Sequence, residues 1–268
     1  MRFCLALLLA VVASAERIEF LALKEEVLQE RLRLAHPKNR ERFARLKALF
    51  DETGCRGEAI REQKVPQSKE PNLICAVAGS GGSSRKIIVG AHFDAIGGDG
   101  VIDNWSGAVL LPSLSEFIRR SPRKHDFEFV GFAAEEKGLL GSREYMRKIP
   151  KEDRKNVAAV VALDSLGLGP VKSWPNGSTK EMIAAGSTVA HSLGLSLNGV
   201  NVDAVGTTDS QVFKDARMPV LSLHSVTQET WAIINSGSDV WKAVSWQDYY
   251  DTHRFVSALL VYLDQTLE

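Results

Sequence analysis

FEFVGFAAEEKGLLGS, residues 127–142, joins an apolar run of strand length to two adjacent carboxylates. The run from Phe127 to Ala133 shows little alternation between apolar and polar residues, which is typical of a strand buried on both faces. Glu135 and Glu136 follow almost directly. Charged groups beside a buried strand cost free energy unless they are paired, hydrogen-bonded or bound to a metal. The stretch therefore predicts a site that supplies one of these partners.

The same kind of apolar run recurs along the chain. Four more runs have strand length: LICAV (73–77), KIIVGA (86–91), VAAVVAL (157–163) and PVLSL (219–223). Segments with helical patterns lie between most of them or close the chain: Trp105 to Arg119, Leu139 to Lys148, Lys180 to Leu193 and Trp246 to Leu267. This alternation predicts an α/β fold, a single three-layer domain with a mixed, mostly parallel central sheet flanked by helices on both faces.

The first fifteen residues, MRFCLALLLAVVASA, are typical of a cleaved signal peptide. They combine one arginine, an apolar run too short to span a bilayer comfortably, and the small residues Ala13, Ser14 and Ala15 at the end. We expect residues 1–15 to be removed and the mature protein to be secreted or periplasmic, with no membrane contact after signal removal. Residues 16–268 are expected to form the one domain.

Residues 16–54 predict a helical lead-in packed on that domain. One amphipathic helix is expected from Arg17 to about Ala35, and a second from about Pro37 to Phe50. The arginine-rich faces between Arg31 and Arg45 are interpreted as solvated, because acidic residues are interspersed. The whole chain balances 33 basic against 33 acidic residues, which argues against a nucleic-acid partner. We expect a monomer.

Removal of the signal peptide leaves two cysteines, Cys55 and Cys75. Disulfides persist in exported proteins, so the two residues form either a disulfide or two separate buried thiols. No cysteine or histidine spacing suggests a cysteine-bound zinc ion.

Polar residues able to bind a metal end several of the apolar runs. KIIVGA leads into His92 and Asp94, VAAVVAL ends at Asp164, and PVLSL ends at His224. Sites in open α/β sheets lie beyond the carboxyl ends of the strands. Together with the glutamate pair, four strand ends are therefore predicted to aim side chains at one crevice.

Asp103 belongs with this group because it closes the loop after His92 and opens DNWSG before a predicted helix. It is also well suited to be an ordinary helix N-cap, but its companions favour the role of metal ligand. Carboxylates clustered around one histidine repel each other when no cation is bound. Zinc accepts both nitrogen and carboxylate oxygen, and two-metal hydrolytic sites hold their ions ~3.5–4 Å apart.

Two further roles follow from backbone geometry. Alternate residues of an extended chain face one way, so Asp94 is expected to accept a hydrogen bond from His92 and set its tautomer, unless it is rotated away or only salt-bridged. Adjacent residues face opposite ways, so one of Glu135 and Glu136 is expected to bind metal and the other to act as general base. The residues alone leave open which is which.

These motifs resemble the zinc-dependent exopeptidases typified by secreted bacterial leucyl aminopeptidases, with glutaminyl cyclases as relatives. The matching pieces are HFD (92–94), DNWSG (103–107), FAAEEKGLLGS (132–142), ALDSLG (162–167) and TDSQVFKDARMPVLSL (208–223). Four or more motifs in the family's order make the resemblance specific, and it covers the chain from about Gly90 to its end.

The resemblance implies a catalytic domain that binds two zinc ions. One ion would be held by His92, Asp103 and Asp164. The other would be held by Asp103 as a bridge, Glu136 and a histidine near the C-terminus. The resemblance also makes Glu135 the general base and Asp94 the residue that orients His92.

The late histidine is where this sequence departs from the family pattern. The pattern is His-Ser/Thr-x-x-Asp, and its best match here is Asn235 to Asp239. Asparagine is a poorer zinc ligand than imidazole, so the second ion is expected to bind weakly, to use another residue, or to be absent. His224 and His253 are the possible substitutes; His253 on the closing helix is better interpreted as structural.

The resemblance predicts a metal-dependent aminopeptidase that hydrolyses the N-terminal peptide bond of peptides through a metal-activated water. Two alternatives remain open. One is a glutaminyl cyclase that works on one zinc, and the other is a non-catalytic peptide-binding protein whose site is weakened at Asn235. The intact DNWSG box and His92 favour hydrolysis.

Overall fold

The structure is a computed structural model that describes residues 23–80, 83, 85–204 and 206–267. The predicted signal peptide and the first residues of the lead-in lie outside the described residues. The lead-in continues as α1 (Glu25–Leu32) and α2 (Asn39–Glu52). Residues 23 and 24 are not helical, so the single helix expected from Arg17 to about Ala35 is wrong: α1 begins at Glu25 and ends three residues before Ala35. The second helix extends two residues beyond Phe50. None of the described helices is long and apolar enough to cross a bilayer.

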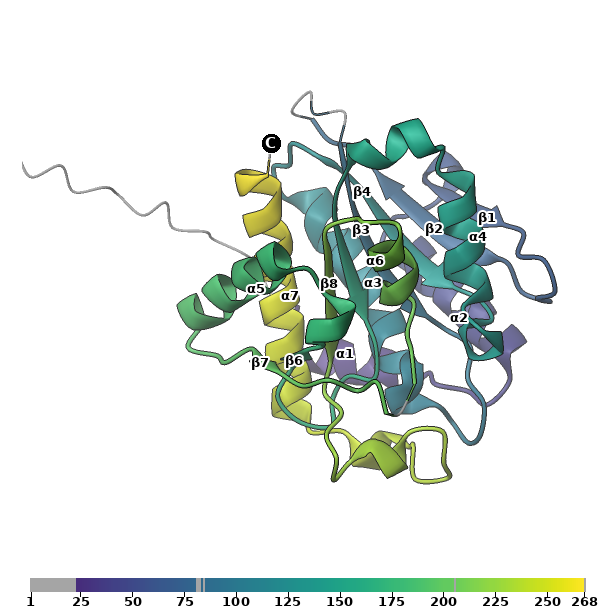
Figure 1. Ribbon diagram of the computed structural model, residues 1–268. Coiled ribbons are helices and arrows are strands. Elements are labelled where there is room, and N and C mark those ends of the chain that lie inside the picture. The colour runs from purple at the N-terminus through teal and green to yellow at the C-terminus, as the bar shows by residue number, and fades with distance from the viewer. Residues whose placement is uncertain (1–22, 81–82, 84, 205, 268) are drawn as a thin grey trace, which may run out of the picture.

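The described strands form one eight-stranded sheet in the order β1-β2-β4-β3-β5-β8-β6-β7 (Figure 1). Their bounds are β1 (Ile60–Gln63), β2 (Asn72–Val77), β3 (Lys86–His92), β4 (Asp126–Phe132), β5 (Val157–Leu163), β6 (Lys172–Ser173), β7 (Asn198–Gly199) and β8 (Val220–His224). The four central strands β4, β3, β5 and β8 are parallel, whereas β2 and β6 run antiparallel to their central neighbours. The predicted mixed, mostly parallel sheet is confirmed.

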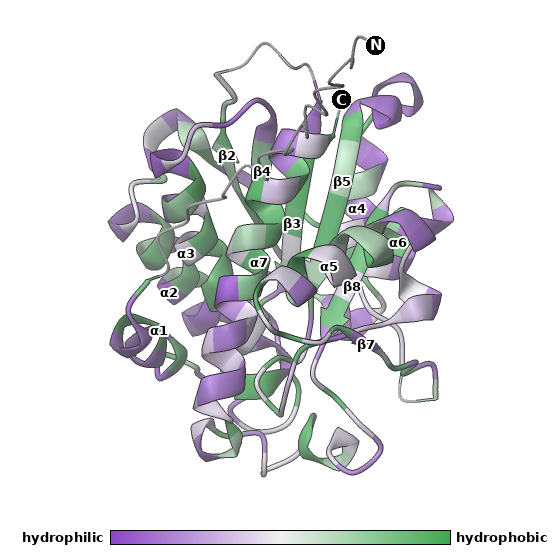
Figure 2. Cartoon of the chain, turned by 90° about the vertical axis from the view of Figure 1, so that its left-hand side faces the viewer, coloured by the Kyte–Doolittle hydropathy of each residue, from purple (hydrophilic) through white to green (hydrophobic). Residues whose placement is uncertain are grey.

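Helices cover both faces of this sheet (Figure 2). The remaining helices are α3 (Ser106–Arg120), α4 (Leu140–Lys148), α5 (Lys180–Ser192), α6 (Ser210–Asp215) and α7 (Trp246–Thr266). One core cluster packs α1, α2, α3, α5 and α7 against the sheet, and a smaller cluster around Phe132, Tyr145 and Phe213 lies under α4 and α6. The three-layer prediction is therefore correct.

The apolar runs predicted as strands form, and so do the four helices predicted after residue 104, with ends within about two residues of their expected positions. Elements that the sequence did not indicate are short or polar. The strand β1 reads IREQ, β6 and β7 have two residues each, and α6 has six. Segments of that length carry too few residues to display a period.

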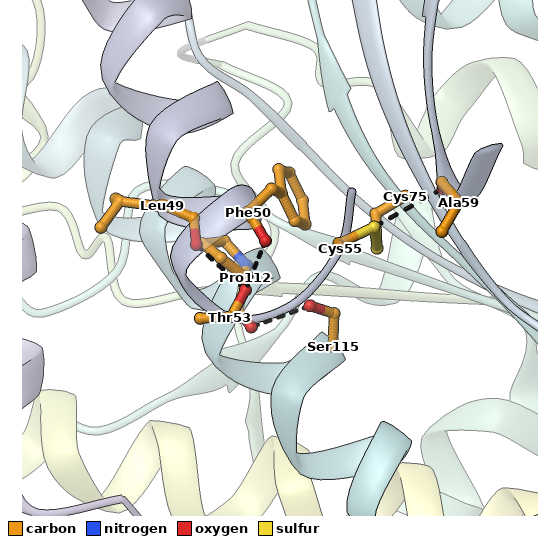
Figure 3. The surroundings of a disulfide bond; sticks show 8 residues. All are labelled: Leu49, Phe50, Thr53, Cys55, Ala59, Cys75, Pro112 and Ser115. Atoms are coloured by element: carbon orange, nitrogen blue, oxygen red, sulfur yellow. Dashed lines mark hydrogen bonds between the residues drawn. A yellow bond between two sulfur atoms is a disulfide. The ribbon is translucent and has the colours of Figure 1, made fainter. Parts of the chain in front are cut away.

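Cys55 and Cys75 form a disulfide, with their Cα atoms 6.1 Å apart (Figure 3). It joins the turn after α2 to strand β2, and so ties the lead-in to the sheet. The helix is capped by Thr53, whose hydroxyl donates to the carbonyls of Leu49 and Phe50. The disulfide thus adds a cross-link between the end of the lead-in and the sheet.

Candidate metal centre

A cavity of about 190 Å³ opens beyond the carboxyl ends of the central strands. Most of the residues that the sequence singled out line it, and we call this group the polar wall: His92, Asp103, Glu135, Glu136, Asp164 and Asn235. The other lining residues are largely uncharged, and we call them the uncharged wall; they include Trp174, Val202, Ser222, His224, Val226 and Ile234. The four strand ends therefore do meet at one crevice, because parallel strands place their carboxyl ends at the same edge of the sheet.

His92 is the centre of the polar wall. It is the last residue of β3, and its side chain is only 2% exposed. Its Nε2 atom lies 3.1 Å from Asp103 Oδ1, 3.7 Å from Asp164 Oδ1 and 4.0 Å from Glu135 Oε2. Three carboxylates from three different segments thus converge on one imidazole nitrogen.

The other ring nitrogen of His92 faces Asp94. Nδ1 lies 3.1 Å from the backbone carbonyl oxygen of Asp94 and 3.6 Å from its carboxylate Oδ1. The carboxylate instead accepts the backbone N–H groups of Glu135 at 3.0 Å and Glu136 at 3.3 Å. Asp94 therefore joins the end of β3 to the turn after β4, and both its main chain and its side chain face the imidazole.

The two glutamates do not lie in extended backbone, so the argument that they face opposite ways was wrong. Glu135–Lys137 is a 3-10 turn, entered through Ala134 in the left-handed conformation, with φ of 55°. Both side chains consequently reach the same cavity. The turn packs tightly on α4: a Cβ atom on Gly141 would lie 2.4 Å from the carbonyl oxygen of Ala133.

The side chains of Glu135 and Glu136 differ in their surroundings. One ligand atom each from His92, Glu135 and Asp164 lies within 4.8 Å of the other two, and Glu136 is outside this compact group. Glu136 has a buried Oε1 atom with no hydrogen-bond partner among the described residues. Both carboxylates are thus available to a cation, and Glu135 is the nearer to His92.

Asp103 lies in the turn Val101–Trp105, which precedes α3, and its peptide bond to Asn104 is cis. It is not the cap of the helix, because Asn104 Oδ1 accepts the Gly107 N–H at 2.9 Å instead. The backbone N–H groups of Ile102 and Asp103 donate to the carboxylate of Asp239, at 2.5 and 3.0 Å. The carboxylate of Asp103 itself faces His92.

Asn235 lines the cavity, and its role as a metal ligand stays a prediction. Its backbone is left-handed, with φ of 55°, and the residue is exposed. The amide oxygen is therefore available to a ligand. A neutral amide remains a weaker partner for zinc than an imidazole.

The two histidines considered as substitutes are otherwise engaged or distant. His224 lines the cavity, but its Nε2 donates to the Val200 carbonyl at 2.9 Å and its Nδ1 accepts the Val226 N–H at 3.2 Å. Both nitrogens are used, so the imidazole is not placed as a metal ligand. His253 is fully buried on α7, where burial lowers its pKa to about 4. It does not line the cavity.

The electrostatics of the polar wall test whether a cation fits. With no cation present, burial and the neighbouring carboxylates raise the pKa of Glu135 to about 9 and that of Glu136 to about 7. Burial alone would lower the pKa of His92, but Glu135 and the other carboxylates outweigh it and raise the pKa well above 6.5. The cluster thus holds protons where a divalent cation would supply the charge. Nitrogen and carboxylate donors of this kind fit zinc.

Three charged residues near the site were given no role by sequence reasoning. Asp239 and Asp209 lie in quoted motifs, whereas Arg42 was counted within a solvated face. Asp209 is buried, its Oδ1 has no hydrogen-bond partner among the described residues, and burial raises its pKa to about 7. Arg42 is 0% exposed, so the solvated interpretation was wrong for that residue. No local signal in an amphipathic helix distinguishes a buried arginine from an exposed one.

The fold and the cluster of imidazole and carboxylate side chains define an α/β domain with a candidate metal-binding site at the carboxyl edge of its sheet. The chain belongs to peptidase family M28, whose sequence profile matches residues 72–260.

Curated relatives are matched over part of their length. An aminopeptidase of Pseudomonas aeruginosa is 28% identical over 104 residues, which are 38% of this chain and 19% of that protein. The alkaline phosphatase isozyme conversion protein of Escherichia coli is 24% identical over 220 residues, or 68% of this chain and 63% of that protein. The chain thus spans less than two thirds of the length of either relative.

Solved structures share the fold. The LapA aminopeptidase of Legionella pneumophila superimposes with a TM-score of 0.75 at 19% identity, over 91% of this chain and 71% of that one. A glutaminyl cyclase of an Acidobacteriales bacterium superimposes with a TM-score of 0.76 at 16% identity, over 96% and 99% of the two chains.

Proposed function

We propose that this protein is a metal-dependent aminopeptidase that removes the N-terminal residue of peptides. The observation that carries the proposal is the convergence of Asp103, Asp164 and Glu135 within 4.0 Å of one nitrogen of His92, at the edge of an open cavity. Membership of a peptidase family supports hydrolysis of a peptide bond as the reaction.

His92, Asp103 and Asp164 would hold one zinc ion, with one nitrogen and two carboxylate donors. Asp103 would also contribute to a second position, together with Glu136 and Asn235. When bound, zinc supplies Lewis acidity, which polarises the carbonyl of the scissile bond and lowers the pKa of a neighbouring water. Because Asn235 offers only an amide, the second position is the weaker one.

Glu135 is proposed as the general base. It reaches the cavity from a turn whose amides are held by Asp94, so its carboxylate has a fixed place beside His92. In this role it takes a proton from the attacking water and gives it to the leaving amine. Without a cation the pKa of Glu135 is about 9, so the group holds a proton at neutral pH and can act as a base only when a bound cation lowers that pKa.

The uncharged wall of the cavity would receive the side chain of the first residue of the peptide. Trp174, Val226 and Ile234 give it an apolar surface. His224 adds a neutral imidazole, because burial lowers its pKa and its two nitrogens bond to the backbone. Such a wall favours an uncharged side chain, since a charged one would lose its hydration without gaining a partner.

The direct test is zinc titration into the metal-free mature chain, residues 16–268, while hydrolysis of aminoacyl-p-nitroanilides is followed. We expect activity to rise with a tight first equivalent and to change again with a weaker second one. Apolar aminoacyl groups should be cleaved faster than charged ones. Tight zinc binding without hydrolysis of any aminoacyl substrate would contradict the proposal and favour a non-catalytic peptide-binding protein.

A glutaminyl cyclase is the second candidate. The observation that favours it is the match in size, since the superposition covers 96% of this chain and 99% of the cyclase chain. The same protein preparation should therefore be given a peptide with N-terminal glutamine. Release of ammonia with retention of the peptide's length identifies a cyclase, whereas release of free glutamine identifies an aminopeptidase.

A further inference from the structure

Arg42, on α2 of the lead-in, is completely buried and lies behind the polar wall of the cavity. It does not line the cavity itself. Its Nε donates to the Phe93 carbonyl, Nη1 donates to the Asp99 carbonyl at 2.8 Å, and Nη2 donates to the Gly100 carbonyl at 3.0 Å. A single side chain thus binds three carbonyls of the loop that follows β3.

That loop carries the metal-binding residues at both of its ends. Phe93 stands between His92 and Asp94, and Gly100 directly precedes the turn that contains Asp103. The planar guanidinium group spans the two ends of the loop, because its donors have a fixed fork geometry. The relative position of His92 and Asp103 is therefore defined partly by a residue about fifty positions earlier in the chain.

Two further contacts fix the guanidinium group. Its central carbon lies 5.2 Å from the centre of the Trp105 ring, in the geometry of a cation–π contact. Gly100 approaches it closely: a Cβ atom there would lie 3.1 Å from Arg42 Nη1, and the backbone of Gly100 is left-handed with φ of 58°. The loop and the arginine are packed against each other without room for a larger residue.

Charge supports the same arrangement. Burial lowers the pKa of Arg42 to about 10, and Asp94, Asp103, Asp239 and Glu136 act in the opposite direction. These are carboxylates of the metal-binding wall and its supports. A buried cation behind the wall offsets part of their mutual repulsion.

We propose that Arg42 is a positioning residue of the metal centre, which holds the loop between His92 and Asp103 in the geometry that binds the ion. The inference rests on the proposed metal-dependent function. It extends the functional unit beyond residues 72–260, the part that matches the family profile.

The test compares Arg42→Lys and Arg42→Ala with Arg45→Lys. Arg45 is a matched control, because it lies on the same helix and donates to the carbonyls of Leu34 and Ala35 and not to the loop after β3. Zinc affinity is measured by competition with a chelating indicator, and thermal unfolding of the metal-free proteins is measured in parallel. Both Arg42 variants should bind the first zinc ion about 10–100-fold more weakly, as expected for residues that orient metal ligands, whereas Arg45→Lys should bind it normally.

Rescue separates positioning from a general loss of structure. Guanidinium ion at low millimolar concentration should restore zinc affinity to Arg42→Ala, because it can occupy the vacated place and donate to the same carbonyls. Ammonium ion at equal concentration should not. Folded Arg42 variants that bind zinc as tightly as the wild type would overturn the inference. So would an Arg42→Ala protein whose zinc affinity guanidinium ion does not restore although its loop after β3 is unchanged.

Hydrogen exchange keeps the two proposals distinguishable. In metal-free Arg42→Lys, amides of residues 93–103 should exchange faster than in the wild type, while those of α5 should not change. A wild-type protein that bound no zinc would overturn the proposed function. Even then, faster exchange confined to residues 93–103 of Arg42→Lys would support the contact between Arg42 and the loop. Unchanged exchange in these residues would overturn the positioning role of Arg42.

Discussion

Asp239 holds Asp103 in place: its Oδ2 accepts the backbone N–H of Asp103 at 3.0 Å, while Oδ1 accepts the N–H of Ile102 at 2.5 Å. The two residues are 136 positions apart in the chain. The late NSGSD segment therefore holds the turn of Asp103 through its last residue, while its first residue, Asn235, lines the same cavity.

Replacement of Asp239 by asparagine should weaken zinc binding. An amide has one oxygen where the carboxylate uses two, so one of the two N–H groups loses its acceptor and the turn carrying Asp103 loosens. We expect a loss of about tenfold in zinc affinity, at the lower end of the usual range for residues that support metal ligands. Asp251→Asn is the control, because Asp251 pairs with Arg254 on α7 away from the site. Equal affinities of both variants would contradict the assignment.

Asn235→His should strengthen the second metal position. Imidazole is a better zinc ligand than an amide, and histidine is among the residues that tolerate the left-handed backbone found at this position. Calorimetric zinc titration should show the second equivalent binding at least about tenfold more tightly, with a faster peptidase rate. If both quantities stayed at the wild-type values, residue 235 would not be part of the metal centre.

Glu135→Gln separates the two roles open to this residue. As general base, Glu135 should be needed for turnover, and its loss should reduce kcat by about 10²–10⁴-fold with zinc affinity nearly unchanged. As the third member of the compact group with His92 and Asp164, it would instead be a ligand, and zinc affinity would fall as well. Glu136→Gln, measured beside it, should show the reverse pattern: weaker binding of the second ion with a smaller loss of rate.

The stability of the metal-free protein should fall as the pH rises. The pKa of Glu135 is raised from 4.5 to about 9 and that of Glu136 to about 7, so the folded state binds these protons more tightly than the unfolded state does. Their contribution is complete below the unfolded value of 4.5 and is lost as the pH passes through the folded values. The raised pKa of His92 acts in the same direction.

Thermal unfolding of metal-free and zinc-loaded protein between about pH 6 and about pH 9 measures this effect, because zinc binding displaces the retained protons. The gain in unfolding temperature on adding zinc should grow with pH. Calorimetry in buffers of different ionisation enthalpy should also detect proton release. A gain that was independent of pH would mean that the carboxylates are already ionised without metal.

Loss of the Cys55–Cys75 disulfide should destabilise the protein without abolishing the site. The two cysteines are 20 residues apart, and a closed loop of about this length contributes about 3 kcal/mol through the entropy of the unfolded chain. The Cys55→Ser, Cys75→Ser double variant should unfold at lower urea concentration with the same zinc affinity. A parallel loss of zinc affinity would show that the disulfide also positions the lead-in against the loop after β3.

The sheet, the main helices and the convergence of four strand ends could be predicted because each depends on patterns a few residues long. Continuous apolar runs mark buried parallel strands, and the polar residues after them mark one edge of the sheet. The resemblance to known exopeptidases added the assignment of roles. His92 and Asp164 were found in this way because each directly follows or ends its strand.

The remaining features depend on contacts that no local pattern reveals. The turn at Glu135 begins with Ala134 in a left-handed conformation that alanine rarely adopts. The sequence therefore shows no sign of the turn, and the extended backbone expected for the two glutamates was wrong. His224 ends a strand just as His92 does, yet Val200 and Val226 occupy both of its nitrogens. Arg42 has the sequence context of a surface residue and becomes buried only when α2 packs against the loop after β3.

The disulfide and the guanidinium contacts of Arg42 also bear on how the protein should be divided for study. A fragment trimmed to residues 72–260 would keep every side chain that faces the cavity. It would also expose an unpaired thiol at Cys75, leave the carbonyls of Phe93 and Gly100 without their donor, and cut the last turns from α7. The region that sequence comparison recognises is thus smaller than the unit that has to be expressed, and a failed assay on the shorter piece would say nothing about the activity of the whole.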